Sequence, residues 1–394
     1  MATSSSYPAR FGGPGRAAFV AAVTPSSGKM AWSRDIGFAL ESARPDVLTW
    51  GTSVLVVGHR QMALFDADGH RRWTRDKRAG SPVAINNGRL YFENRGRFLD
   101  AVDIDNQLVI DSAPLAGVTG QGWQVSQLWP QRDDFIVTLT NPDPVYDEED
   151  ETRPHPQPSV VGHRVAYGQR LGDWGQRYAG VQALPALFVP ELGRWLAALP
   201  AVVSVDVRQG DESPRFRLPL DKLVDWSADA AGRLVVSGYL QGAKALLALA
   251  IDGRELWRWV DRDGGDGWAA RQPPLQAGTR AYALTDGRLL AFDAGKLLWQ
   301  CDLRSAGLHH GATVGDGSFE VRDGRLLSTA KLAYATALAD NTVLVVGDRT
   351  LHAVAADGSL RFGITLDAPL QAPAVVDASG NVFVLTATQL VKLR

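Results

Sequence analysis

The chain of 394 residues has a single cysteine, little net charge and no long apolar segment. Its one cysteine, Cys301, excludes an internal disulfide and any metal site built from several cysteines. The formal net charge of -2 gives no general basic surface of the kind that binds nucleic acid. No apolar run reaches the length of about 20 residues that a membrane-spanning helix needs. We therefore expect no nucleic-acid partner and no membrane span.

Familiar catalytic motifs are also missing from the sequence. It contains no Gly-x-Ser-x-Gly nucleophile elbow, no phosphate-binding loop and no His-Glu-x-x-His zinc motif. We therefore predict that the protein is not an enzyme.

One short pattern recurs along the chain, and residues 247–259 show it best. Apolar residues alternate with alanines from Leu247 to Ile251, which is the period-two pattern of a strand. Asp252 and Gly253 then favour a tight turn, and a second alternating segment carries Trp257. The pattern predicts a β-hairpin with a tryptophan on its second strand.

Related hairpin patterns occur at 63–73, 99–110, 290–299 and 351–362. In five of seven intervals the ends of these units lie about 40 residues apart. The unit ends are Trp32, Trp73, Ile110, Trp174, Phe216, Trp257, Trp299 and Phe362. Four short strands in about 40 residues are typical of one β-propeller blade, as in WD40-like proteins. The sequence therefore predicts an all-β, eight-bladed propeller of four-stranded antiparallel blades.

The two ends of the chain supply incomplete units. Residues 370–394 give three strands, and a lone N-terminal strand ends at Trp32. Pairing these two groups would complete the eighth blade and remove exposed sheet edges. We interpret the apolar run 16–23 as part of this structure, with a short secretory signal as the alternative. We thus expect a disordered tail at 1–11 and a single propeller domain at 12–394.

Two intervals between unit ends are about twenty residues longer than the others, which indicates insertions. The segment at about 141–159 is rich in proline and acidic residues, so we expect a mobile loop between two strands of one blade. The segment at about 303–332 lies between two blades and predicts an extra hairpin near 319–327. In a four-stranded meander both insertions would leave the same face.

These units resemble the quinoprotein-type, or PQQ-like, β-propeller repeat family. The family motif Ala-x-Asp-x-x-x-Gly-x-x-x-Trp resembles residues 64–73, 249–257 and 291–299. The resemblance covers nearly the whole chain and weakens between about 111 and 225. It implies that tryptophans dock between neighbouring blades, here Trp32, Trp73, Trp174, Trp257 and Trp299. The quinone-dependent dehydrogenases with this fold use adjacent cysteines, which this chain lacks, so we expect the scaffold without the quinone cofactor.

Three side-chain clusters are candidates for binding. Asp261, Asp263 and Asp266 follow the alternating oxygen pattern of a calcium-binding loop, with a plain turn as the alternative. An acidic run and an adjacent histidine pair are candidate contacts for a protein partner, with solvated loops as the alternative. These residues are Asp147, Glu148, Glu149, Asp150, Glu151, His309 and His310.

Together these features predict a non-enzymatic scaffold that binds another protein through the decorated face or the central channel. We expect a monomeric propeller within a bacterial multiprotein complex, in a conflict, defence or assembly system, and we expect it in the cytoplasm. One alternative is a periplasmic scaffold similar to the propeller lipoprotein of outer-membrane protein assembly, although no N-terminal cysteine is present for lipidation. The other alternative is a quinone- or calcium-dependent enzyme.

Overall fold

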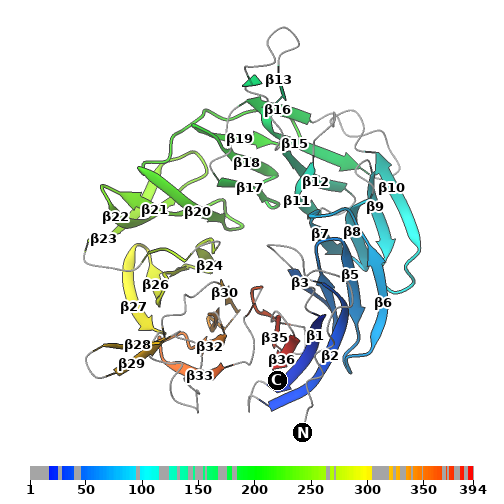
Figure 1. Cartoon of the computed structure of the whole chain (residues 1–394). Coiled ribbons are helices and arrows are strands. Elements are labelled where there is room, and N and C mark those ends of the chain that lie inside the picture. The colour runs from blue at the N-terminus through cyan, green and yellow to red at the C-terminus, as the bar shows by residue number, and fades with distance from the viewer. Residues whose placement is uncertain are drawn as a thin grey trace. The chain divides into compact units, whose positions relative to one another are not determined.

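A computed structural model of the chain contains β-strands, β1 to β36, and no helix among the described residues (Figure 1). The described residues are 17–24, 29–39, 46–94, 98–114, 124–130, 134–140, 145–146, 154–155, 158–166, 175–179, 184–262, 267–269, 272–303, 319–322, 325–328, 334–338, 340–347, 349–365, 370, 372–376, 382–385 and 389–393. Within these ranges there is no helix long and apolar enough to cross a membrane. The strands belong to two compact units, Met1–Asp76 with Asp263–Arg394, and Lys77–Arg262.

The first unit contains three four-stranded antiparallel sheets whose strands follow chain order. The first sheet consists of β3 (Asp46–Trp50), β4 (Ser53–Val57), β5 (Gln61–Phe65) and β6 (Arg71–Asp76). The second consists of β24 (Leu275–Ala277), β25 (Arg280–Leu284), β26 (Arg288–Asp293) and β27 (Lys296–Asp302). The third consists of β30 (Tyr334–Ala337), β31 (Val343–Val346), β32 (Thr350–Val354) and β33 (Leu360–Thr365).

The two ends of the chain share a further, five-stranded sheet in the same unit. Its order is β2 (Lys29–Ala39), β1 (Ala17–Thr24), β36 (Gln389–Leu393), β35 (Val382–Leu385) and β34 (Val375–Val376). β1 runs parallel to β36, and the two strands lie side by side in Figure 1. The terminal segments therefore pair, as the sequence predicted. The pairing strand is β1, however, and the strand that carries Trp32 lies at the outer edge.

The second unit also contains three four-stranded antiparallel sheets. The first consists of β7 (Val83–Asn86), β8 (Arg89–Asn94), β9 (Phe98–Asp103) and β10 (Val109–Pro114). The second consists of β11 (Gln124–Pro130), β12 (Asp134–Thr140), β15 (Pro158–Ala166) and β16 (Gly175–Ala179). The third consists of β20 (Lys222–Ala228), β21 (Leu234–Leu240), β22 (Ala243–Leu249) and β23 (Glu255–Asp261). A three-stranded sheet contains β17 (Leu184–Val189), β18 (Arg194–Ala198) and β19 (Val202–Asp206).

The prediction of eight four-stranded blades is wrong, because the described residues form six of them. The three-stranded sheet meets the segment after β19 only through isolated bridges, at Glu212 and at Phe216. Pro214 lies between these two bridges and has no N–H group, so it cannot donate to a continuous ladder. The terminal sheet has five strands because Ala17–Thr24 forms a strand of its own.

Both predicted insertions contain short two-stranded hairpins. β13 (Val145–Tyr146) pairs with β14 (Pro154–His155) between β12 and β15. β28 (Phe319–Arg322) pairs with β29 (Arg325–Ser328) between β27 and β30, where the sequence predicted an extra hairpin. The acidic residues 147–151 lie outside the described part.

The burial of each strand follows from its position in the sheet. Every residue of β4 is buried, and its sequence Ser-Val-Leu-Val-Val is almost continuously apolar. Inner strands are covered on both faces, so they lose the alternation that a half-exposed strand shows. The outer strand β6 is mostly exposed or half-buried, and only Trp73 is buried in it.

Within each unit, consecutive sheets pack face to face through apolar side chains. Tyr282 and Leu289 of the β24–β27 sheet share a core with Val345 of the next sheet. Trp195 and Val203 of the three-stranded sheet pack with Ile136 of the sheet before it. Such sheet-to-sheet cores, repeated along the chain, give stacked antiparallel blades.

Candidate functional site

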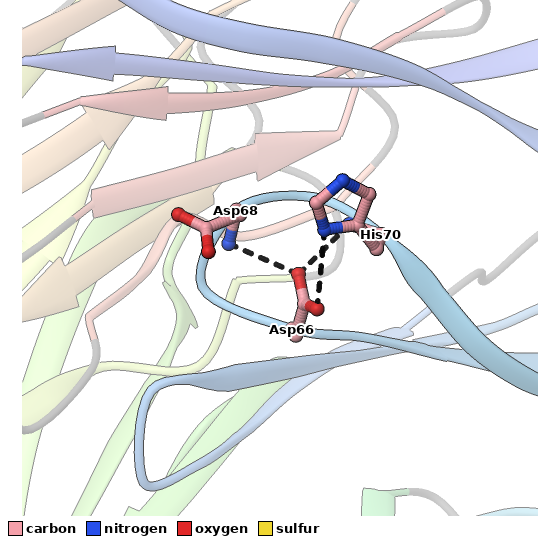
Figure 2. Close-up of side chains that lie close together, drawn as sticks. All are labelled: Asp66, Asp68 and His70. Atoms are coloured by element: carbon pink, nitrogen blue, oxygen red, sulfur yellow. Dashed lines mark hydrogen bonds and ion pairs between the residues drawn. The ribbon is translucent and has the colours of Figure 1, made fainter.

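The turn between β5 and β6 brings two carboxylates and an imidazole together (Figure 2). Oδ1 of Asp66 accepts hydrogen bonds from the backbone N–H groups of Asp68 and His70, at 3.0 and 2.8 Å. Oδ2 of Asp66 lies 3.4 Å from Nδ1 of His70. One potential ligand atom from each of the three side chains lies within 4.8 Å of the others, so the group could supply three ligands to a cation.

Other contacts of this turn favour a structural role for Asp66. Its Oδ1 atom is already used by two backbone donors, and the His70 side chain is 71% exposed. An aspartate that accepts a backbone N–H two residues ahead forms an Asx turn, which fixes a tight connection. We therefore interpret the cluster as a turn cap.

The same carboxylate-to-backbone hydrogen bond recurs in other outer turns. The acceptor is the aspartate and the donor is the N–H two residues later, with distances from 2.8 to 3.0 Å. The aspartates are Asp103, Asp206, Asp252 and Asp357. At Asp357, hydrogen bonds from the side chain and backbone of Ser359 lower the pKa of the carboxyl group. The turn aspartates of these repeats thus serve the fold.

Aromatic side chains of one sheet sit on the turns of the next sheet. The indole Nε1–H of Trp32 on β2 donates to the carbonyl oxygen of Ala67 at 2.8 Å. The indole Nε1–H of Trp299 on β27 donates to the carbonyl oxygen of Ala356 at 3.0 Å. Both carbonyls belong to outer hairpin turns, so the hydrogen bond has the same position in two different sheet pairs.

A turn glycine lies directly beneath each docked ring. A Cβ atom added to Gly69 would lie 2.6 Å from Cδ2 of Trp32, and one added to Gly358 would lie 2.8 Å from Cδ2 of Trp299. A Cβ added to Gly253 would lie 2.4 Å from Cγ of Phe216. The three glycines have positive φ angles, between 79° and 90°. Each position therefore needs glycine for two reasons: its φ angle is positive, and the aromatic ring leaves no room for a Cβ atom.

The remaining docking tryptophans differ in what the structure describes. Trp73 is buried and Trp257 is half-buried, whereas Trp174 lies outside the described residues. Two tryptophans that the sequence did not single out are fully buried between sheets. Trp195 donates to Oγ1 of Thr138 at 3.0 Å, and Trp226 donates to the carbonyl oxygen of Pro185 at 2.5 Å. Their strands lack the Asp-Gly turn signal, so only their apolar surroundings could have indicated them.

The predicted calcium loop has one described member. Oδ2 of Asp261 lies 3.2 Å from Nζ of Lys244, directly across from it in the β22–β23 register. The Lys244 side chain is 2% exposed, and this carboxylate is one partner of its buried ammonium group. Asp263 and Asp266 lie outside the described residues, so the calcium site stays a prediction.

The predicted partner contacts also lie outside the described part of the chain. They are Asp147, Glu148, Glu149, Asp150, Glu151, His309 and His310. Their role in binding a partner stays a prediction.

A buried carboxylate that the sequence did not reveal links two sheets of the second unit. Glu93 on β8 forms an ion pair with Arg78, and its Oε2 accepts the backbone N–H of Val125 on β11 at 3.3 Å. Burial raises the pKa of Glu93, while the hydrogen bond and charge of Arg78 oppose that rise. Nearby Lys77 donates to the carbonyl oxygen of Ser81 at 2.7 Å. These contacts are internal and connect consecutive sheets.

The outer strand β10 and the residue before it expose three consecutive apolar side chains. The side chains of Leu108, Val109 and Ile110 are 66%, 53% and 46% exposed. β10 is the last strand in its sheet order, so its outer edge has no neighbouring strand in that sheet. Exposed apolar residues are usually scattered singly, so three in a row make this segment a candidate docking surface. We call Leu108–Ile110 the apolar edge.

The register of β10 corrects the sequence-based choice of Ile110 as the unit end. In four other outer hairpins the residue after the bulge, opposite the third strand, is aromatic: Trp73, Trp257, Trp299 and Phe362. In the β9–β10 hairpin that register position is occupied by Asp111, opposite Ala101. A carboxylate cannot pack on a turn as an indole does. The strand therefore lacks the aromatic side chain that the other four hairpins carry at this position.

No protein-family model matches the sequence, and no curated protein matches it. A solved structure that matches is the crystal structure of BamB from Moraxella catarrhalis, with a TM-score of 0.50 and 13% sequence identity. The match covers 87% of this chain and 87% of that chain. At this identity the likeness concerns the fold. Together with the stacked antiparallel sheets, it defines the chain as an all-β β-propeller.

Proposed function

We propose that the protein is a non-enzymatic scaffold that binds another protein. The observation that carries the proposal is the apolar edge, three consecutive exposed apolar residues on the outside of one blade. An exposed sheet edge invites another chain to pair with it, and most proteins protect such edges with charge. A propeller supplies a rigid support for this edge. The turn carboxylates, by contrast, are engaged in holding hairpins.

We also propose that the repeats are of the PQQ-like type. The support is the hydrogen bond from an indole N–H to a turn carbonyl, formed by Trp32 and by Trp299 over a glycine. The proposal concerns the scaffold, without quinone chemistry. Native mass spectrometry of protein purified from its host tests this point. A bound quinone would replace the scaffold proposal with an enzyme.

The interaction itself is tested by cross-linking in the native host. The tagged chain should capture one or a few proteins in reproducible stoichiometry, and these proteins should be absent from a tag-only control. If the wild type shows no cross-linked species other than the chain itself, the scaffold proposal fails.

We propose a cytoplasmic location as part of the same function, in a bacterial multiprotein system. Fractionation of host cells should recover the chain with a cytosolic marker enzyme. Recovery with periplasmic markers would replace this location with that of an envelope assembly scaffold.

A further inference from the structure

The apolar edge differs from the corresponding segments of the other outer hairpins. The position of Leu108, the first residue after the turn, is polar in the four hairpins that carry an aromatic residue after the bulge. There it is occupied by His70, Arg254, Lys296 and Ser359. Charged residues at sheet edges discourage pairing with another chain. This protection is missing at Leu108, and the next two residues are also apolar and exposed.

The backbone that presents the apolar edge is held firmly. Oδ1 of Asp103 accepts the N–H groups of Asp105 and Asn106, at 2.9 and 2.8 Å. The N–H of Asp103 donates to the carbonyl oxygen of Leu108 at 2.9 Å. On the far side, Ser112 donates its hydroxyl to Oδ1 of buried Asp100 at 2.6 Å. A strand fixed at both ends binds an extended chain without a further ordering cost of its own.

Negative charge stands at both ends of the apolar edge. Asp105 is exposed in the turn before it, and Asp111 is half-buried directly after it. A second copy of this chain, paired in either direction, would bring these acidic ends together, which is unfavourable. A partner with basic residues at the same spacing would gain complementary charge pairs. Pro114 closes the strand, and because proline has no N–H it limits the pairing length to the residues before it.

We infer that β10 and the apolar edge bind an extended segment of a protein partner, which adds a strand to the outside of this blade. The segment has β-branched apolar residues at its centre and Lys or Arg at both ends. Main-chain hydrogen bonds to the edge provide affinity, and the apolar and charged side chains provide selectivity. This inference rests on the proposed scaffold function and names its docking site and partner chemistry.

The test uses the full-length protein and a fluorescein-labelled, end-capped octapeptide, Lys-Arg-Val-Thr-Val-Ile-Arg-Lys. Fluorescence anisotropy should show saturable binding to the wild type. Val109→Lys should weaken binding by about tenfold or more, since it adds a like charge beside the basic peptide. Leu256→Lys is the matched control, because Leu256 is 42% exposed on outer strand β23, and it should bind as the wild type does.

Two altered peptides test the mode of binding. Replacing the four basic residues by Glu should weaken binding by about tenfold or more, and methylating alternate backbone nitrogens should abolish it, because the ladder donors are lost. Leu108→Gln, at a 66% exposed position, is a second protein variant in case Val109→Lys does not fold. Equal binding of all three peptides, or of the edge variants and the wild type, would overturn the inference.

Cross-linking in the host separates this inference from the proposed function. Loss of the captured partner in Val109→Lys, but not in Leu256→Lys, supports the edge as its docking site. Capture of the same partner by the wild type and by Val109→Lys overturns the edge while the scaffold function stands. Capture of no partner by the wild type overturns the scaffold function itself.

Discussion

The contact between Phe216 and the turn at Gly253 predicts a specific free-energy cost for one added methyl group. Gly253 has a φ of +90°, and its added Cβ would lie 2.4 Å from Cγ of Phe216. Gly253→Ala therefore combines left-handed strain of about 1–2 kcal/mol with overpacking of about 1–3 kcal/mol. We expect the free energy of unfolding to fall by about 2–5 kcal/mol.

A matched glycine isolates the packing part of this cost. Gly242, in the preceding turn of the same sheet, has a φ of +80° and no atom within 4 Å of an added Cβ. Gly242→Ala should therefore cost only the backbone strain, about 1–2 kcal/mol. The excess of Gly253→Ala over Gly242→Ala then measures the ring contact, about 1–3 kcal/mol.

Urea unfolding followed by tryptophan fluorescence gives these free energies, and Phe216→Ala completes a double-mutant cycle. Once the ring is gone, Gly253→Ala should cost no more than Gly242→Ala, since only the strain remains. An equal cost of the two glycine variants in the wild type would refute the docking contact. An excess that persists without the Phe216 ring would show that another atom causes it.

Three further perturbations have defined outcomes. Burial lowers the pKa of His352 from 6.5 to about 4, so on acidification the unfolded state binds a proton at a higher pH than the folded state does. About 3 kcal/mol of stability that is present above pH 6.5 should therefore be lost as the pH falls towards 4. His352→Leu should flatten the dependence of the melting temperature on pH over that interval. Asp261→Ala removes a carboxylate that pairs with the buried Lys244 ammonium, and it should lower the free energy of unfolding by about 1.5–3 kcal/mol in urea unfolding; an unchanged stability would show that this ion pair does not hold the β22–β23 ladder. Trp299→Phe removes the donor to Ala356 and should lower the unfolding free energy by about 0.5–1.5 kcal/mol in the same assay; no change would show that ring packing alone holds the turn.

Hairpins were predictable from the sequence because their signals are local. The alternation at Leu247–Ile251 and the Asp252-Gly253 dipeptide predict β22, a turn and β23, as observed. The turn geometry needs only one glycine with a positive φ and one aspartate that accepts the Arg254 N–H at 3.0 Å. Such features depend on few residues, so a short segment determines them.

Blade completeness was not predictable because it depends on strands that are distant in the chain. The sequence indicated that 16–23 belongs to the structure, and Ala17–Thr24 does form β1, but its place as a separate strand between β36 and β2 was not predicted. Whether one or two N-terminal strands join the sheet depends on which backbone N–H and C=O groups remain unpaired after the C-terminal strands β34, β35 and β36 have paired with one another. The unit that ends at Phe216 was wrongly predicted to have a fourth strand. The sequence contains the reason, because Pro214 has no N–H group and interrupts that strand.

The candidate site was predictable only in part, because exposure is not a property of a residue type. Leu108, Val109 and Ile110 resemble any apolar strand in the sequence, and only the sheet order places them on an outer edge. The sequence did not single out Asp66, Asp68 and His70, which the structure brings together, and the hydrogen bonds of Asp66 are made to its own turn.

The repeat loses its structural aromatic residue at the same hairpin where it exposes an apolar edge. Four outer hairpins keep an aromatic residue after the bulge and a polar residue after the turn. In the β9–β10 hairpin both are reversed, with Asp111 at the aromatic position and Leu108 at the polar one. If this hairpin had simply lost its aromatic residue without gaining a function, polar residues at the exposed edge would carry no cost. Three exposed apolar residues at the same edge instead bring a risk of aggregation. The joint reversal therefore favours an edge retained for a partner strand over a decayed blade.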